Sequence, residues 1–494
     1  MLTKNDSNNT LWLVAKDWIQ YLPTAIIPAI LMIIASAIFT RMFPPHIYGL
    51  YSLALAISLP IINAFSQPLS QPIGRFYYEY SSKGQIHILW QAMSILMFRV
   101  MVILLPVDTI LGFWLIRSHR EPISMTSALL IFIILQVLTA SLMPTILSSF
   151  QTRHYQIIIL ATTFLGVALS IGFTTLGGPD ISFLLWANVL ASLIFLPIIY
   201  RWSKMHMSWP LFYKNEERVL ALRRFLRYGL PFIPWFVAES MLSIGDRYVL
   251  EWFHGPTSVA VYSVNYALAQ QAVGLLAGPF MTALWPRIMQ QWSKDGVEAT
   301  RTALRNVTNI YCIVGGLVVG LLFVDGHSLM SILVGRQYVR GFIIIGPVAV
   351  GRAIWGSSII GHKTMELTER NSLMTWDAVI AAILNILLNI WWVPRYGMLG
   401  SSIATIISYL VYTAMIWYQS RSQLPWDISL NVVIVVMALT FVSTIIVDKI
   451  TFEGIAIVHL LLSTIMFLVL YGTGLIVWKR KHLKLIKNFL AQGE

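Results

Sequence analysis

Hydrophobic segments follow one another along almost the entire chain, separated by short polar stretches. About fourteen segments can be drawn, each of about 18–27 residues, which lets an α-helix cross a hydrocarbon core of about 30 Å. The longest polar stretch runs over 203–227. The pattern predicts an all-α polytopic membrane protein with helices near 17–40, 48–70, 89–115, 124–149, 157–175, 182–202, 228–252, 258–284, 302–324, 341–362, 372–393, 398–420, 428–447 and 455–478.

Composition agrees with this prediction and narrows the class of protein. Hydrophobic residues make up 57% of the chain and charged residues 11%, against about 25% charged in a soluble domain. The single cysteine, Cys312, lies in a hydrophobic segment, so an intrachain disulfide is impossible. Residues 1–16 are polar, carry both charge signs and lack a cleavage site, which predicts an uncleaved first helix.

The distribution of positive charge predicts the orientation of the helices. The formal net charge is +13, an excess that in a polytopic membrane protein reflects cationic cytoplasmic loops rather than nucleic-acid binding. Alternate loops hold 24 and 7 of the 34 Lys and Arg residues, and the other 3 lie within segments. This bias predicts that both termini are cytoplasmic.

The long polar stretch contains a second type of helix. In Asn215–Arg227, Val219, Leu222 and Leu226 recur at helical spacing among four arginines. The pattern predicts a basic amphipathic helix at the inner membrane surface, where anionic lipids attract it. A simple connector between two lobes is the alternative interpretation.

Two parts of the chain repeat each other. Leu22-Pro23 opens the first segment and Leu230-Pro231 the seventh, and Tyr51-Ser52 and Tyr262-Ser263 follow after similar intervals. Six segments separate the copies, so both copies start on the same side of the membrane and the repeat is parallel. The predicted organisation is a cytoplasmic N-terminus 1–16, an N-lobe 17–202, a basic linker 203–227, a C-lobe 228–420, two further helices within 421–478 and a basic tail 479–494.

The sequence resembles a known family at three places. Arg227–Tyr266, RYGLPFIPWFVAESMLSIGDRYVLEWFHGPTSVAVYSVNY, resembles the seventh and eighth helices of Wzx-like polysaccharide repeat-unit flippases. Arg41–Leu53, RMFPPHIYGLYSL, resembles the first turn of that family, although Phe43-Pro44 stands where Leu-Gly is usual. Arg395–Thr405, RYGMLGSSIAT, resembles the opening of the twelfth helix. The resemblance implies the MOP or MATE-like fold, with two pseudo-symmetric six-helix lobes and two C-terminal helices.

Polar side chains within the segments form stripes at helical spacing. Tyr262, Tyr266 and Gln270 share one face of the eighth segment, and Asn63 and Gln67 share one face of the second. Stripes on both lobes predict a central solvated cavity. Hydrogen bonds between helices, worth about 0.6 kcal/mol each, are the alternative explanation.

Arg352 is the main candidate for substrate binding, because a charge at the bilayer centre costs about 2.5–3.5 kcal/mol and needs a partner. Its planar guanidinium suits a diphosphate, with Arg247 and Arg99 as further cations. Trp355, three residues later, offers a ring on which a sugar can pack. A structural salt bridge from Arg352 to Glu239 is the alternative.

Three carboxylates are candidates for coupling or gating: Glu239, Asp246 and Asp377. Glu239 and Asp377 could carry a coupling proton, because burial favours the neutral form of a carboxyl group. Asp246 lies near the outer end of its segment, where it could close a gate, and a structural pair with Arg247 is equally open. His459 in the last segment is a single candidate for a proton relay.

The sequence lacks the motifs of a P-loop and of an H-E-x-x-H or cysteine-based metal site, so we expect no cofactor and a transporter rather than an enzyme. The resemblance implies that it flips an undecaprenyl-diphosphate-linked oligosaccharide from the inner to the outer leaflet of a bacterial cytoplasmic (inner) membrane. We expect gradient-coupled alternating access by a monomer among membrane lipids, with a polysaccharide polymerase and glycosyltransferases as candidate partners. A cation-coupled multidrug exporter of the same fold and a membrane glycosyltransferase or polymerase are the alternatives.

Overall fold

A computed structural model describes residues 26–119, 122–149, 151–206, 216–294, 296–368, 370–450 and 456–479. The predicted N-terminus 1–16, the part of the linker from 207 to 215 and the tail beyond 479 lie outside the described residues. In the described ranges all regular elements are helices. The predicted all-α class is therefore confirmed.

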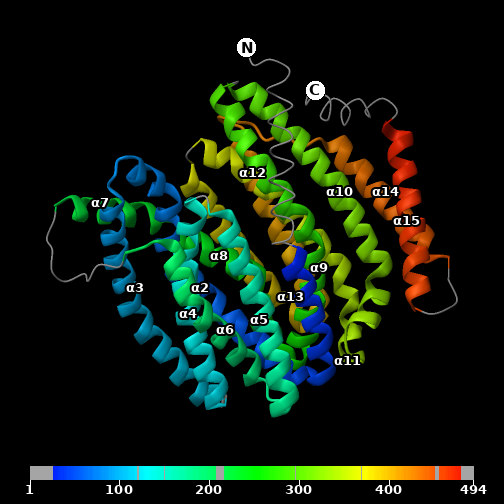
Figure 1. The fold of residues 1–494 in the computed structure, drawn as a ribbon. Coiled ribbons are helices and arrows are strands. Elements are labelled where there is room, and N and C mark those ends of the chain that lie inside the picture. Colours follow the sequence, from blue (N-terminus) through cyan, green and yellow to red (C-terminus); the bar gives the residue numbers. More distant parts are fainter. Residues whose placement is uncertain are drawn as a thin grey trace. The chain divides into compact units, whose positions relative to one another are not determined.

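The chain forms two compact units. One unit is Met42–Val259, and the other joins the first helix, up to Arg41, to the chain from Ala260 onward. The helices of the Met42–Val259 unit are α2 (Pro45–Ser82), α3 (Ile86–Trp114) continued by the π-helix η1 (Leu115–His119), α4 (Ile123–Ser148), α5 (Thr152–Gly177), α6 (Ser182–Ser203), α7 (Glu216–Gly229), α8 (Phe232–Ile244) and the first part of α9 (Asp246–Lys294). Figure 1 labels the α-helices of this unit.

The second unit contains the helix Ile26–Met42 up to Arg41 and the rest of α9. Its other elements are α10 (Gly296–Leu333), α11 (Arg336–Val339), the 3-10 helix η2 (Arg340–Ile344), α12 (Ile345–Leu367), α13 (Asn371–Ser420), α14 (Leu430–Asp448) and α15 (Ala456–Lys479). The last two helices pack against each other and against α10, as Figure 1 shows.

Each predicted segment overlaps a described helix. In the ranges that the structure describes, ten helices are long and apolar enough to cross a membrane, and the shorter apolar helix Ile26–Met42 overlaps the first segment from residue 26 onward. Helix α13 contains two predicted segments, and α9 contains the eighth segment together with the end of the seventh. Single glycines kink both helices: Gly255 in α9 has φ 73° and Gly397 in α13 has φ 52°. Positive φ values of this kind cost glycine little, and each kink falls where the sequence predicts a turn.

The two units differ in one respect from the predicted lobes 17–202 and 228–420. The first predicted segment groups with the chain from Ala260, and the seventh, formed by α8 and the start of α9, groups with Met42–Val259. These two segments hold equivalent places in the predicted parallel repeat. The grouping thus differs from the predicted lobes at these two segments, and the six-helix lobes stay a prediction.

The first helix is attached to the end of α10 by hydrogen bonds. The guanidinium of Arg41 donates to the carbonyl oxygens of Ile332 and Leu333 at 2.8 Å each, and the Thr40 hydroxyl accepts the N–H of Gly335 at 3.1 Å. The last carbonyls of a helix lack partners within it and carry partial negative charge, so an arginine stabilises them.

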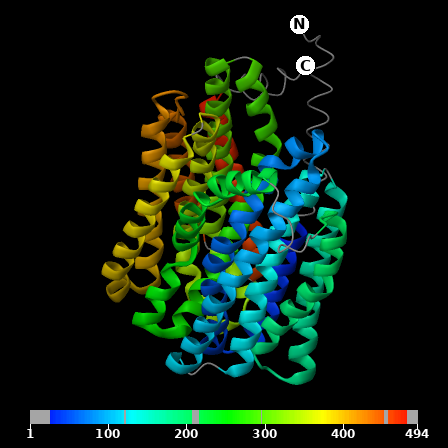
Figure 2. The ribbon, with the colours of Figure 1, turned by 90° about the vertical axis from the view of Figure 1, so that its left-hand side faces the viewer.

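The linker helix α7 lies across the upright helices of its unit, as Figures 1 and 2 show, and packs on α2 and α3. Its buried residues are Arg218, Ala221, Leu222, Phe225 and Gly229. Of the predicted apolar stripe, Leu222 is buried, but Val219 is 40% exposed. The buried face of α7 differs from the predicted apolar stripe because the Phe225 ring stacks on Phe76 of α2, with centroids 5.4 Å apart.

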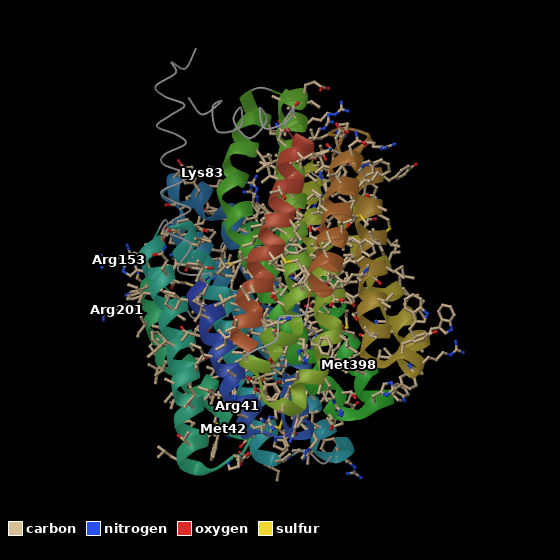
Figure 3. The ribbon with its side chains drawn as sticks, turned by 90° about the vertical axis from the view of Figure 1, so that its right-hand side faces the viewer. Arg41, Met42, Lys83, Arg153, Arg201 and Met398 are labelled. Atoms are coloured by element: carbon tan, nitrogen blue, oxygen red, sulfur yellow. The ribbon has the colours of Figure 1, made fainter. Side chains whose placement is uncertain are left out.

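Cations of the predicted cytoplasmic loops lie toward one end of the Met42–Val259 unit. Figure 3 shows Lys83, Arg153 and Arg201 toward one end of the helices and Met42 toward the other. The ends of α5 and α6 that carry Arg153 and Arg201 are joined by the His154 and Trp202 rings, 4.4 Å apart. These cations therefore lie at the same end of the unit, and which side of the membrane this end faces stays a prediction.

Candidate substrate and coupling sites

The predicted polar stripe on α2 is hydrogen-bonded within its unit. The Asn63 side-chain amide donates to the Ser240 hydroxyl of α8 at 2.8 Å, which joins two helices that pack along each other. The Gln67 side-chain oxygen accepts hydrogen bonds from Gln71 at 2.8 Å and from Ser70 at 3.1 Å. Asn63 and Gln67 are half-buried, so both remain candidates for the cavity wall.

Asp246 and Arg247 form a buried pair. Asp246 is 1% exposed, and its carboxylate lies 3.3 Å from the guanidinium of Arg247, which also donates to the carbonyl oxygen of Ser243. Glu239 lies two turns earlier on α8 and is half-buried. The geometry supports the structural interpretation of the Asp-Arg pair, and its gating role stays a prediction.

Arg99 has a different environment. It is exposed on α3, next to Phe98, which is 49% exposed, and near Val102, which is 52% exposed. The Arg99 side chain therefore lies outside the packed interior of the Met42–Val259 unit. Its predicted contact with substrate phosphate stays a prediction.

The Trp355 ring lies in a buried aromatic cluster between α12 and α13. Its centroid is 5.0 Å from that of Tyr409 and 5.2 Å from that of Tyr412, and the ring is 5% exposed. The Tyr412 hydroxyl lies 2.7 Å from Nε2 of His362, which is also buried. Tyr409 and Tyr412 cover the Trp355 ring, which the sequence analysis predicts to pack on a sugar. A sugar can therefore contact this ring only if the cluster opens.

Arg352 lies one turn before Trp355 on α12 and is half-buried. The helix that carries it, α12, packs against α10 and α13. A half-buried guanidinium of this kind keeps part of its surface available to an anion. Its role as a diphosphate anchor stays a prediction.

The predicted stripe on the eighth segment is mostly buried in α9. Tyr262 and Tyr266 are 0% and 1% exposed, with ring centroids 5.5 Å apart, whereas Gln270 one turn later is half-buried. Between them, the Asn265 amide donates to the carbonyl oxygen of Tyr338 at 2.9 Å. Of the stripe, Gln270 is the residue best placed to reach a cavity.

The coupling candidate Asp377 shares one face of α13 with Asn385 and Asn389, because the three follow helical spacing, and this face turns toward the second half of α13. All three are at most 2% exposed. Gln419 donates to the Asp377 carboxylate at 2.8 Å, and Asn385 lies 3.4 Å from the Thr405 hydroxyl. These contacts pair the two parts of the kinked helix within one unit, as the alternative of interhelical hydrogen bonds expects.

Two buried carboxylates escape the sequence prediction. Asp108 on α3 is 3% exposed, and its Oδ1 has no hydrogen-bond partner among the described residues. Asp325 on α10 is 2% exposed and is bonded to α15. Asp108 lies inside the predicted segment 89–115 and could have been found there. Asp325 lies one residue beyond the predicted end of segment 302–324, while the helix continues to Leu333.

In the ranges that the structure describes, no group of three or more His, Cys, Asp or Glu side chains could hold a metal ion.

The candidate residues for substrate binding and coupling fall into two sets, one in each unit. Asn63, Gln67, Arg99, Glu239, Asp246 and Arg247 belong to the Met42–Val259 unit, and Tyr262, Tyr266, Gln270, Arg352, Trp355 and Asp377 belong to the other. A cavity shared by both sets stays a prediction.

Comparison with known proteins identifies the family. The model of the family described as polysaccharide biosynthesis protein matches residues 14–292, which is more than half of the chain. An uncharacterized membrane protein, MJ1068, of Methanocaldococcus jannaschii is 23% identical over 49% of this chain and 47% of its own length. The capsular polysaccharide biosynthesis protein CapF of Staphylococcus aureus is 22% identical over 47% of this chain and 58% of its own length.

The chain thus aligns with about half of the length of these relatives. Solved structures extend the likeness to the whole fold. The lipid II flippase MurJ in an inward closed conformation superimposes with a TM-score of 0.74 at 15% identity, covering 94% of this chain and 100% of that one. An inward-facing multidrug resistance MATE family transporter of the MOP superfamily gives a TM-score of 0.60 at 13% identity, covering 82% of this chain and 97% of that one. The fold is therefore like that of MurJ and of MATE transporters, and the predicted family resemblance is confirmed: the chain belongs to the polysaccharide biosynthesis protein family.

Proposed function

We propose that this protein moves a polyprenyl-diphosphate-linked oligosaccharide from the inner to the outer leaflet of a cytoplasmic membrane. The observation that carries the proposal is membership of the polysaccharide biosynthesis family on a fold like that of a lipid II flippase. A probable low-salt glycan biosynthesis flippase, Agl15 of Haloferax volcanii, is 22% identical over 27% of this chain and 28% of its own length. The names of these relatives agree with lipid-linked saccharides as the substrate class.

The diphosphate is the part of such a substrate that most resists crossing the membrane, because it is charged. Arg352 on α12 would hold it, since an arginine keeps its charge and forms two parallel hydrogen bonds with phosphate oxygens. Its half-buried position leaves the guanidinium partly accessible. Gln270, Asn63 and Gln67 would bond sugar hydroxyls, and the polyprenyl chain would stay in lipid.

Alternating access requires the two compact units to change their relative arrangement during transport. A gradient would drive the cycle, and Glu239 is the first candidate for the coupling group because it is half-buried on α8 beside polar residues. Asp377 is the second, although its bond to Gln419 supports a structural role as well. The protein would work as a transporter, without covalent chemistry on the saccharide.

Complementation tests the proposal. The full chain is expressed in a bacterial strain that lacks its own repeat-unit flippase, and surface glycan is measured together with the abundance of the protein in the membrane. We expect export with the wild type, a partial loss with Arg352→Lys and a larger loss with Arg352→Ala, because lysine keeps the charge but not the bidentate geometry. Normal glycan from a normally abundant Arg352→Ala protein would refute the anchor.

If Arg352 is instead the structural partner of Glu239, the pattern differs. Arg352→Ala would then lower protein abundance, and adding Glu239→Gln would restore it by removing the unpaired charge. Failure of export with every natural repeat unit tested, in a protein that is abundant and correctly oriented, would refute the proposed function.

Multidrug export is the second candidate, favoured by the likeness to MATE transporters. Exported drugs are often cationic, whereas the candidate residues include three arginines, Arg99, Arg247 and Arg352. Drug susceptibility of the same strain separates the two functions: resistance without glycan export would support drug transport. A membrane glycosyltransferase or polymerase would instead transfer sugar. An assay of the purified protein in vesicles that contain a labelled lipid-linked saccharide would detect this activity.

A further inference from the structure

A polar cluster joins α10 to α15, away from the residues proposed to hold substrate. Asp325 on α10 is 2% exposed. Its Oδ2 accepts a hydrogen bond of 2.7 Å from the Thr464 hydroxyl of α15, and its Oδ1 accepts one from the Ser463 hydroxyl. One turn further along α10, the Ser328 hydroxyl lies 3.2 Å from Nδ1 of His459.

The cluster is part of a continuous contact between two antiparallel helices. Toward the start of α10, Gly320 faces the Phe467 ring so closely that a Cβ there would lie 2.0 Å from it. Further along, the Tyr471 hydroxyl donates to the carbonyl oxygen of Ile313 at 2.8 Å. The carboxyl group of Asp325 is therefore held in a packed, fixed position.

The Ser463 hydroxyl has a second acceptor, and this property makes the cluster suited to two protonation states. Its oxygen lies 2.6 Å from the carbonyl oxygen of His459 in the preceding turn of α15. A hydroxyl group carries one hydrogen, which rotates toward either acceptor, and its oxygen can accept a hydrogen bond at the same time. The position of this hydrogen can therefore follow the charge of Asp325.

When Asp325 is charged, Ser463 and Thr464 donate to its two oxygens. When Asp325 is protonated, its own hydrogen is donated to the Ser463 oxygen, and Ser463 turns its hydrogen to the His459 carbonyl. Thr464 donates to the other carboxyl oxygen in both states. No group of the cluster loses its partner, so binding a proton avoids the cost of an unsatisfied buried polar atom.

Few titratable side chains lie near Asp325 in the described ranges. His459 on α15 is half-buried, and its ring lies against the Ser328 hydroxyl one turn along α10 from Asp325. From α12, the apolar Ile345 packs at the adjacent Gly326. Another titratable side chain at this end of the unit, Tyr338 of α11, is buried. The following side chains at this end are exposed, and in the described ranges none of them is hydrogen-bonded or ion-paired to Asp325: Arg41, His327, Arg336, Arg340, Asp448 and Lys449.

We infer that Asp325, with Ser463, Thr464 and His459, forms a proton-binding site at the contact of α10 and α15. The site binds and releases a proton while the two helices stay in contact, and His459 provides a titratable group beside it for the transfer. The predicted topology places this end of α10 on the outer side of the membrane. The inference concerns proton binding itself, so it stands whether or not the protein carries a lipid-linked saccharide.

Infrared difference spectroscopy on the full-length protein in lipid vesicles tests the site without a transport assay. We expect the wild type to show the carbonyl stretch of a protonated carboxyl group that disappears as pH rises, and Asp325→Asn to lack this component. Asp448→Asn, which changes an exposed carboxylate at the end of α14, is the matched control and should keep it. An Asp325→Asn titration identical to that of the wild type would overturn the inference.

A second variant covers the case in which Asp325→Asn does not accumulate. Thr464→Val keeps the shape of the side chain but removes a donor to the charged carboxylate, so the midpoint of the titration should move to higher pH by about 1–2 units. Thr473→Val is its control, because the Thr473 hydroxyl is exposed and bonds within α15. An unchanged midpoint in Thr464→Val would overturn the inference as well.

Discussion

The guanidinium of Arg224 on α7 holds both carboxylate oxygens of Glu79 on α2, with two nitrogen–oxygen distances of 2.9 Å. The same guanidinium lies 4.4 Å from the centroid of the Phe76 ring, and Nζ of Lys83 lies 3.1 Å from Glu79. The hydrogen bond to the carboxylate raises the pKa of Arg224 above its ordinary value. This contact fixes the linker helix to the last turns of α2.

Arg224→Lys should loosen α7, because lysine keeps the charge but loses the two-pronged contact and the planar group over Phe76. The pair is partly exposed, so we expect a loss of about 0.2–1 kcal/mol in the free energy of unfolding. A double-mutant cycle with Glu79→Gln, followed by thermal unfolding in detergent, measures the coupling. Arg223→Lys, an exposed neighbour, is the control, and zero coupling would contradict the role of the pair.

Gly49→Ala should destabilise the Met42–Val259 unit. A Cβ at Gly49 would lie 2.0 Å from the carbonyl oxygen of Pro256, so the backbone of one of the two turns has to move. Overpacking of this kind costs about 1–3 kcal/mol. Gly172→Ala on α5 is the matched control, because nothing lies within 4 Å of its added Cβ and alanine favours the helix. Equal unfolding temperatures for the two variants would contradict the predicted clash.

Cysteine labelling tests the predicted orientation. In a Cys312→Ser background, which removes the single native thiol, cysteines at Arg336 and Lys449 should react with an impermeant reagent added outside intact cells. Cysteines at Lys83 and Arg421 should react only after the cells are opened, because the loop bias of 24 to 7 places them in the cytoplasm. External labelling at Lys83 would invert the assignment.

Glu239→Gln should impair glycan export while the protein stays abundant, because it removes a titratable group with little change in volume. We expect about a tenfold lower rate, equivalent to about 1.4 kcal/mol, and a weaker dependence of export on external pH. Glu298→Gln, which changes an exposed carboxylate at the start of α10, is the control. Full export with an unchanged pH profile would reduce Glu239 to a packing role.

Some features of the site could be predicted from spacing, and others could not. The face shared by Asp377, Asn385 and Asn389 follows from helical geometry. What that face contacts does not, because a membrane helix is apolar on all sides and its pattern does not separate lipid, cavity and neighbouring helix. Trp355 shows the same limit: its place after Arg352 could be read from the sequence, but its burial between Tyr409 and Tyr412 could not.

The sequence by itself determined the helices, their order, the turns at Gly255 and Gly397 and the family, because long apolar runs and glycine or proline turns are local properties. Only the tertiary structure decided which helices group into each compact unit, which face of α7 is buried, and that Asp325 meets Ser463 and Thr464. These outcomes depend on contacts between residues far apart in the chain, and the fit of side chains in three dimensions selects them.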